Sequence, residues 1–560
     1  MLRVPDSEEI LALGEKLGLD FTMPEAEIVR ERIVVKLNEV DQFYEAHFPG
    51  EHEQRPRGTS YRPSVEEDPL NAFISKFRIE GAESGPLAGK TVALKDHISV
   101  AGVPLTLGSH FMDGYIADVD ATVVTRLLDH GATVIGKLNM DDFASGGGLL
   151  GAGNFGRTLN PHGTGFVSGG SSSGAGAAVA GGYVDIAIGG DQGGSVRNPA
   201  SYCGIVGLKP TFGLVPHTGA IGADPSLDYL GPMTRRVEET ALTLQCIAGP
   251  DGSDPRQRSM PDIPDYSSLL DRGVEGLRIG ILDEGFGYPR MDDDVSDAVL
   301  AAADVLRGAG ALVTRISVPA HTDAYVPASI IMAEGTRYLF DSNLGGTSAD
   351  TYYPISLITA FGRFKQAAGY ELPLSSKLNA TFAEYLHTRY HGRFYAKAQN
   401  VRGAIRRAYD SALAEVDLLI CPTKPTTAPR YVEPTNYVEE MEYFLSRGEP
   451  GNAAFSRNTA PFNYTGHPAI SVPCAAVNGM PVGMQIVGRH FEDDVVLRAA
   501  YAFQESSGFV IIPDTDHSVS SRAPIEVTTP THGSMVSGAP APIAMPPSHA
   551  PVALPRLNAP

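Results

Sequence analysis

A glycine- and serine-rich stretch at positions 169–197 most constrains what this chain can fold into. Two Gly-Ser clusters, at 169–174 and 193–195, bracket a segment of small residues from 175 to 182. Small residues let backbones approach closely, so this segment predicts a tightly packed helix. The apolar residues of 183–190 then alternate into a short strand. A flexible linker would contain neither element, so we expect the glycines to bring backbone N–H groups very close to another group.

Composition excludes several classes of protein. The 560 residues are 42% hydrophobic and 19% charged, which is ordinary for a globular protein with a large core. The net charge of −21 argues against nucleic acid as a partner, because a polyanion needs a cationic surface. The four cysteines lack CxxC spacing, which favours neither a zinc site nor a disulfide scaffold.

The amino terminus and the hydropathy pattern predict a cytoplasmic protein. The first residues, MLRVPDSEEI, lack a charged region followed by an apolar one, so they do not resemble a secretory signal. No uninterrupted apolar run reaches the ~18 residues that cross a bilayer. We therefore expect no membrane segment.

The chain is predicted to have three parts. Residues 1–65 form a helical prefix, because leucines and isoleucines recur at helical spacing, with breaks at Pro5, Pro24 and Pro49. Residues 66–516 form the main domain, in which strands and helices alternate from Leu87 onward. An aromatic-rich part of it, about 320–460, is expected to be a helical cover over one end of a sheet. Residues 517–560 are rich in Pro and Ala without periodicity, which predicts a disordered tail.

Within the main domain, several elements are specific enough to name. A strand ends at Lys95, and a helix that stops at Gly131 leads into a buried strand at 133–135. The segments from 276 to 318 predict a βαβ unit whose helix begins with acidic residues. Asn478-Gly479 separates two apolar runs and predicts a hairpin turn.

Four short patterns are not interpreted as sites. GATVIGK at 131–137 resembles a phosphate-binding loop, but Leu138 follows where Ser or Thr would coordinate magnesium. Glycines at 146–151 fit GxGxxG without a clear preceding strand, and 170–174 fits GxSxG without the strand of a nucleophile elbow. The glycosylation pattern at Asn463 has no meaning without secretion.

Several blocks together resemble the amidase signature family of serine hydrolases. The run GGSSSGAGAAVAGG and the run GGDQGGSVRNPASYCGIVGLKPT resemble its signature. VALKDHISVAGVPLTLGS, DATVVTRLLDHGATVIGKLNMDDFASGG, AGPDGSDP and TGHPAISVPCAAVNGMPVGMQIVG extend the resemblance, in family order, over most of 85–500. The GGDQGG variant and the prefix look most like bacterial amidases of the nitrile-degradation type, which act on aliphatic and aromatic primary amides. The resemblance implies an α/β fold with a large mixed twisted β-sheet flanked by helices.

The resemblance also implies the catalytic residues. The family's lysine falls on Lys95, its cis-serine on Ser171 and its nucleophile on Ser195. The 24 residues between the two serines fit the family pattern without a gap, which favours Ser171 over its serine neighbours. The family's oxyanion hole falls on the backbone N–H groups of Gln192, Gly193, Gly194 and Ser195. His97 departs from the Asn found in many members, and we expect it to alter hydrogen bonding around the lysine.

These residue types suit amide hydrolysis. A serine hydroxyl is a poor nucleophile and needs a base, and lysine can serve only where a desolvated site keeps it neutral. Lys95 follows the apolar strand residues TVAL, which suits such a site. Asp191 and Arg197 are interpreted as a buried structural pair instead of a substrate contact. Asp96 is expected to point away from Lys95.

The predicted function is therefore hydrolysis of a small-molecule carboxamide to carboxylate and ammonia through an acyl-enzyme on Ser195. No organic cofactor and no metal are implied, and similar amidases suggest a homodimer. An aryl acylamidase or another secondary-amide hydrolase stays open. A glutaminase subunit of a tRNA-dependent amidotransferase is less favoured, because the prefix and the net charge are acidic. A non-catalytic protein on this fold is disfavoured by the intact set of Lys95, Ser171 and Ser195.

Overall fold

The architecture was analysed in a computed structural model of the chain. It describes residues 2–45, 57, 59–144, 152–257, 259–288, 290–345, 350–369, 372, 374–433, 439, 456–511 and 513. The chain separates into two units, Met1–Thr515 and Asp516–Pro560. The predicted disordered tail, the GxGxxG glycines and part of the aromatic-rich segment lie outside the described residues. The three-part division of the chain stays a prediction.

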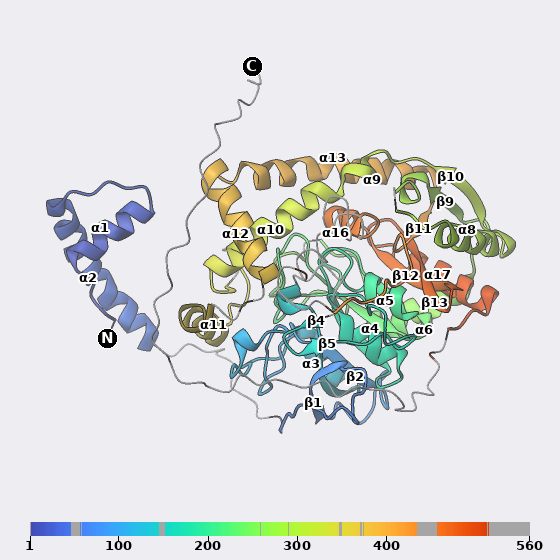
Figure 1. Cartoon of the computed structure of the whole chain (residues 1–560), viewed down its shortest axis with the longest axis horizontal. Helices are drawn as coiled ribbons and strands as arrows, with labels where there is room; N and C mark the ends of the chain where they lie inside the picture. Colours follow the sequence, from blue (N-terminus) through green and yellow to red (C-terminus); the bar gives the residue numbers. More distant parts are fainter. Residues whose placement is uncertain are drawn as a thin grey trace, which may run out of the picture. The chain divides into compact units, whose positions relative to one another are not determined.

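One large mixed sheet organises the described part of the first unit (Figure 1). Its eleven strands follow the order β1-β3-β2-β6-β8-β7-β12-β13-β11-β9-β10, and β4 and β5 form a separate pair. The strands are β1 (Phe73–Ile79), β2 (Thr91–Lys95), β3 (Thr133–Leu138), β4 (Ala152–Gly153), β5 (Gly156–Arg157), β6 (Ile186–Asp191), β7 (Val206–Lys209), β8 (Tyr229–Thr234), β9 (Arg278–Leu282), β10 (Leu312–Ile316), β11 (Leu418–Pro422), β12 (Ala469–Val477) and β13 (Met480–Val487). This confirms the predicted α/β fold.

The strand of the signature segment, β6, lies between β2, to which it is parallel, and β8, to which it is antiparallel. Strands β3 and β6 both run parallel to β2, on either side of it. All six residues of β6 are buried. The predicted strand at 183–190 therefore exists, but it begins later, at Ile186. A central strand that is covered on both faces does not need polar alternation.

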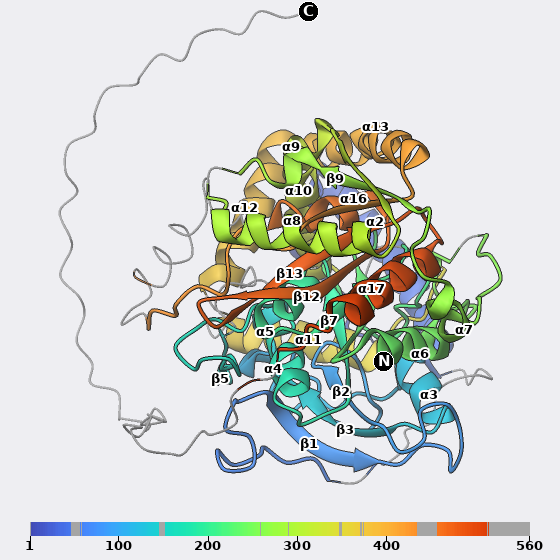
Figure 2. The ribbon, with the colours of Figure 1, turned by 90° about the vertical axis from the view of Figure 1, so that its right-hand side faces the viewer.

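Helices flank the sheet on both faces. The helices of the described residues are α1 (Ser7–Lys16), α2 (Met23–Glu45), α3 (Thr122–Asp129), α4 (Ser173–Ala180), α5 (Arg197–Cys203), α6 (Val237–Ile247), α7 (Tyr266–Leu269), α8 (Asp293–Gly308), α9 (Ala320–Asp323), α10 (Tyr325–Asp341), α11 (Ile355–Ala368), α12 (Leu374–Tyr390), α13 (Arg393–Glu415), α16 (Ala460–Thr465) and α17 (Asp493–Ser507). Of these, α1 and α2 pack against each other. Short 3-10 turns occupy His110–Met112, Asp142–Ala144, Leu270–Arg272 and Asp283–Gly285. Figure 2 shows α8 and α17 beside the long strands β12 and β13, which they contact.

The predicted supersecondary units are present. Strands β9 and β10 are parallel and joined through α8, whose first turn carries acidic residues. Strands β12 and β13 are antiparallel and turn at Asn478 and Gly479, both with positive φ. The buried strand predicted at 133–135 extends to Leu138. Local turn and capping signals therefore identified these units correctly.

The described part of the aromatic-rich segment contains helices α9 to α13, followed by strand β11. Helices α10, α12 and α13 contact one another and lie side by side (Figure 1). Phe361 is fully buried and packs edge-on against Phe111 and Phe340. Aromatic burial therefore holds this cover together, since each ring removes a large apolar area from water.

The amino-terminal helices differ from the prediction in one respect. Pro24 was expected to break the helical pattern, but it is the second residue of the 23-residue helix α2. Proline is tolerated in the first turn because its missing N–H would have no helical acceptor there. Among the described residues, no helix combines the length and the apolar character needed to cross a bilayer.

Candidate active site

The predicted site residues gather where parallel strands end. Lys95 is the last residue of β2, and the loop with Ser195 begins directly after β6. Because β2 and β6 are parallel neighbours, their carboxyl ends meet at the same edge of the sheet. Crevices outside the carboxyl ends of strands are the usual ligand sites of α/β sheets.

The structure brings Lys95 and Ser171 into direct contact. The Lys95 ammonium nitrogen Nζ lies 2.7 Å from Ser171 Oγ and 3.2 Å from the carbonyl oxygen of Gly190. Both side chains are fully buried. The peptide bond between Gly170 and Ser171 is cis. Ser171 can thus exchange a proton with the lysine without any movement of the backbone.

Burial changes the acidity of this lysine. Removal from water lowers the pKa of Lys95 to about 7, even though the carboxylates of Asp141, Asp191 and Asp228 oppose the shift. A neutral amine is therefore well populated at neutral pH, whereas an exposed lysine, with a pKa near 10.4, would be protonated. Such a group can accept a proton.

The predicted nucleophile lies in a tight loop between β6 and α5. Ser195 is partly exposed, unlike Lys95 and Ser171. The N–H of Gly194 donates to Asp191 Oδ1 at 2.6 Å, and the N–H of Val196 donates to the other carboxylate oxygen. The Gly194 N–H is therefore engaged by Asp191. The N–H groups of Gln192, Gly193 and Ser195 remain the candidates for an oxyanion hole.

Asp191 and Arg197 form the buried pair that the sequence favoured. Arg197 Nη2 lies 3.0 Å from Asp191 Oδ1, and both side chains are fully buried. Although burial alone would raise it, Arg197 holds the pKa of Asp191 at about 2. The carboxylate therefore stays ionised, and its role is to hold the loop.

Sequence reasoning missed three partners of this pair. Arg197 also donates to Gln485 Oε1, to Asn463 Oδ1 and to the carbonyl of Thr459, so all five of its N–H groups are used. The Thr459 hydroxyl donates to the Gly193 carbonyl at 2.7 Å. These residues lie more than 250 positions after Arg197. Gln485 falls in one of the blocks that resemble the family, but nothing in that block points to Arg197.

Helix α10 adds an apolar side chain beside the loop. A Cβ built on Gly193 would lie 3.2 Å from the terminal methyl Cε of Met332. The sequence interpretation predicted a helical cover in this region but named no contact. Met332 is therefore a candidate lining residue for the acyl group of a substrate.

Two neighbours of Lys95 bear on the sequence expectations. Asp96 faces away from it, since its carboxylate accepts from Lys137 Nζ at 2.7 Å and from the backbone of Thr106. Neither ring nitrogen of His97 has a hydrogen-bond partner among the described residues. His97 lies so close to Gly190 that a Cβ there would be 2.2 Å from its Nε2. The histidine thus packs against the strand end, where the backbone of Lys95 interacts with it.

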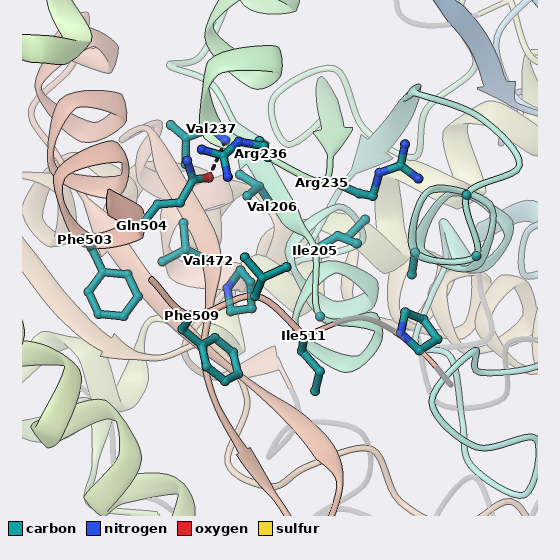
Figure 3. A pocket seen from close by; sticks show the side chains of 17 residues that line it. Ile205, Val206, Arg235, Arg236, Val237, Val472, Phe503, Gln504, Phe509 and Ile511 are labelled. Carbon is teal, nitrogen blue, oxygen red and sulfur yellow. Dashed lines mark hydrogen bonds between the residues drawn. The ribbon is translucent and has the colours of Figure 1, made fainter. Parts of the chain in front are cut away.

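A separate cavity lies beside the sheet (Figure 3). It has a volume of about 410 Å³, and its walls include Val206, Val472, Phe503 and Phe509. Gln504 also lines it and accepts a hydrogen bond from the Val237 N–H. None of Lys95, Ser171 and Ser195 lines it. This cavity is therefore not part of the site that the signature residues form.

The comparisons with known proteins agree with this fold. The family profile described as Amidase matches residues 67–497. The chain therefore belongs to the amidase family. It is an amide-hydrolysing enzyme, as the sequence predicted.

The similar proteins are of two kinds, amidases and an amidotransferase subunit. An enantioselective amidase of Rhodococcus rhodochrous is 38% identical over 521 residues, which is 91% of this chain and 98% of the relative. A glutamyl-tRNA(Gln) amidotransferase subunit of Moorella thermoacetica is 39% identical over 437 residues, 78% of this chain and 86% of the relative. Among solved structures, the peptide amidase of Stenotrophomonas maltophilia superposes with a TM-score of 0.62 at 30% identity, over 77% of this chain and 85% of its own.

Proposed function

We propose that Ser195 is the nucleophile, Ser171 the proton relay and Lys95 the neutral general base in hydrolysis of a carboxamide to carboxylate and ammonia. The observation that carries this proposal is the 2.7 Å contact between the buried Lys95 amine and the Ser171 hydroxyl. A lysine that accepts protons must be desolvated and lack a carboxylate partner. The named donors and acceptors around Lys95 are a hydroxyl and a carbonyl, both uncharged.

In the proposed reaction, the Ser195 hydroxyl oxygen attacks the amide carbon. Its proton passes to Ser171, whose own proton passes to Lys95. The tetrahedral intermediate then expels the amine, which takes a proton back through Ser171, and the acyl group stays on Ser195. Water repeats the sequence and releases the carboxylate, with all three residues restored.

The developing oxyanion would be stabilised by backbone N–H groups of the glycine loop. Gln192, Gly193 and Ser195 supply the proposed donors, and Gly194 contributes by fixing the loop through its bond to Asp191. Losing one oxyanion-hole donor typically costs ~3 kcal/mol of transition-state stabilisation. No metal or organic cofactor takes part in these steps.

The proposed substrates are small primary amides. The match to the enantioselective amidase extends over 91% of this chain, against 78% for the amidotransferase relative. The acidic charge of −21 also speaks against a tRNA-bound partner, and we propose that the chain binds no nucleic acid. A panel of aliphatic, aromatic, anilide and glutamine amides assayed for ammonia or amine release separates these substrate classes.

The acyl-enzyme is tested by trapping with hydroxylamine. A second nucleophile should divert the acyl group to a hydroxamate, in proportion to its concentration. Ser195→Ala should abolish both hydroxamate and ammonia. Ser173→Ala is the matched control, because this nearby serine bonds to Thr158 and not to Lys95. Hydroxamate formation that survives in Ser195→Ala would contradict the assignment.

We also propose a cytoplasmic homodimer. The helical pair α1 and α2 leaves large apolar side chains exposed, among them Leu17 at 71%, Phe43 at 68% and Tyr44 at 79%. We propose that these side chains contribute to the dimer interface, since burying exposed apolar area favours association. Light scattering should give twice the 59.4 kDa chain mass. A chain without residues 1–45 should scatter as a monomer, and a monomeric full chain would contradict the proposal.

A further inference from the structure

A cluster of two histidines and one aspartate lies outside the proposed catalytic residues. Asp410 is on α13, His467 lies between α16 and β12, and His490 lies between β13 and α17. One ligand-type atom from each side chain lies within 4.8 Å of the others. His467 is fully buried, whereas His490 and Asp410 have side chains that are 27% and 47% exposed. The cluster is thus anchored inside the fold and open to solvent at one side.

His467 is held at both ring nitrogens. Its Nδ1 lies 2.9 Å from the Thr465 hydroxyl oxygen, which also lies 2.9 Å from the Pro461 carbonyl oxygen. Its Nε2 lies 3.1 Å from Asp410 Oδ1 and makes a hydrogen bond with this carboxylate. Nε2 is therefore the nitrogen that faces the cluster, and a metal ion that binds there would displace its proton.

The contacts of His490 locate its proton. Its Nε2 lies 3.0 Å from the Thr465 carbonyl oxygen, which can only accept, so Nε2 carries the proton. Its Nδ1 then presents a lone pair, and Asp410 Oδ1 lies 3.9 Å away. Two ring nitrogens and one carboxylate oxygen thus converge on one place, where they can act together as ligands of a cation.

We infer that Asp410, His467 and His490 form a site for a divalent transition-metal ion of the Zn²⁺ class. Zinc accepts imidazole nitrogen and carboxylate oxygen at about 2.0–2.2 Å, which places tetrahedral ligand atoms about 3.4 Å apart. The observed separations of 3.1 and 3.9 Å lie on either side of that value. Thr465 holds the outer nitrogen of each ring, as second partners of metal-bound histidines commonly do.

A bound ion would tie together three distant segments of the chain. Its ligands come from α13 and from the segments that follow α16 and β13. Helix α16 also carries Asn463, whose side-chain NH₂ donates to Asp191 at 2.8 Å. The site is therefore assigned a structural role, one helix away from the glycine loop.

The test is equilibrium binding of Zn²⁺ to the full-length protein after removal of metal with a chelator. Dialysis with elemental analysis should find one zinc per chain. His490→Ala and Asp410→Asn should each weaken binding at least about tenfold, since even outer partners of metal ligands contribute that much. Zinc should raise the Tm of the parent chain and not that of either variant. Metal-free Tm values show whether the variants fold.

Two further variants make the outcome decisive. His110→Ala removes an exposed histidine that also pairs with an aspartate, Asp113, and should leave zinc binding unchanged. Ser195→Ala should bind zinc as the parent does, so failure of the catalytic proposal leaves this one intact. Absence of saturable binding at micromolar zinc, or equal binding by the His490 and Asp410 variants, would overturn the site.

Discussion

Two lysines at the ends of neighbouring parallel strands are both fully buried but have different partners. Lys137 on β3 lies 2.7 Å from Asp96 Oδ1, whereas Lys95 on β2 contacts the Ser171 hydroxyl and a carbonyl. Burial lowers the pKa of both, and for Lys137 the Asp96 carboxylate opposes the shift. Burial is thus common to both lysines, and the partner distinguishes an ion-paired lysine from a proton acceptor.

The comparison explains why Asp96 does not hold Lys95 in its charged form. It follows Lys95 directly in the chain, and a carboxylate facing that lysine would stabilise its ammonium form. Its two oxygens are instead taken by Lys137 and by Thr106. The neighbouring lysine therefore keeps the nearest acid away from the proposed base.

The largest expected effect is on Lys95. Lys95→Arg keeps a cation but cannot release its proton, so kcat should fall about 10⁴-fold or more, close to the loss for Lys95→Ala. The Tm of purified variants and steady-state ammonia release measure fold and activity separately. If Lys95→Arg kept a tenth of the parent rate, Lys95 would act as a fixed cation, and the contrast with Lys137 would fail.

Replacing Lys137 should lower stability more than activity, the reverse of what is expected for Lys95. Lys137→Met leaves Asp96 as a buried carboxylate without its cation, and breaking such a pair typically costs about 3–5 kcal/mol of stability. The Tm should fall clearly, while the folded fraction keeps most of its activity. Adding Asp96→Asn removes the orphaned charge and should restore part of the Tm. A double variant no more stable than the single one would show that the pair is not the cause.

The smallest expected effect is on Met332. Met332→Ala opens space beside Gly193, so kcat/KM for bulky amides should rise relative to acetamide by no more than about tenfold. Ser329→Ala is the control, because Ser329 lies one turn earlier on α10, is half-buried, and donates its hydroxyl to the Val326 carbonyl of the same helix. Unchanged ratios across the amide panel would remove Met332 from the substrate pocket.

The sequence predicted what depends on short segments. The helix at 175–182, the strand ending at Lys95 and the hairpin at Asn478-Gly479 all follow from local periodicity and turn residues. The family blocks named Lys95, Ser171 and Ser195, and the structure brings the first two into contact. The Asp191–Arg197 pair was also identified, because both residues lie within the signature itself.

What the sequence missed depends on contacts between distant segments. Asn463 was set aside as a meaningless glycosylation pattern, yet it bonds to both members of the Asp191–Arg197 pair. No histidine was assigned to a metal, because His467 and His490 are far from Asp410 along the chain. Tertiary packing brings such groups together, and no spacing rule along one segment reports it.

The most direct test of the neutral-base account is the pH dependence of kcat/KM. We expect the rate to fall about tenfold per pH unit below a pKa of about 7, where Lys95 becomes protonated, and to level off above it. The pH at which kcat/KM falls should move lower on warming. Amines lose a proton with a large ionisation enthalpy, whereas carboxyl groups do not. The fall should persist in Lys424→Met, which removes another buried lysine whose pKa is also lowered to about 7. A fall near pH 10, one insensitive to temperature, or one lost in Lys424→Met would contradict Lys95 as the base.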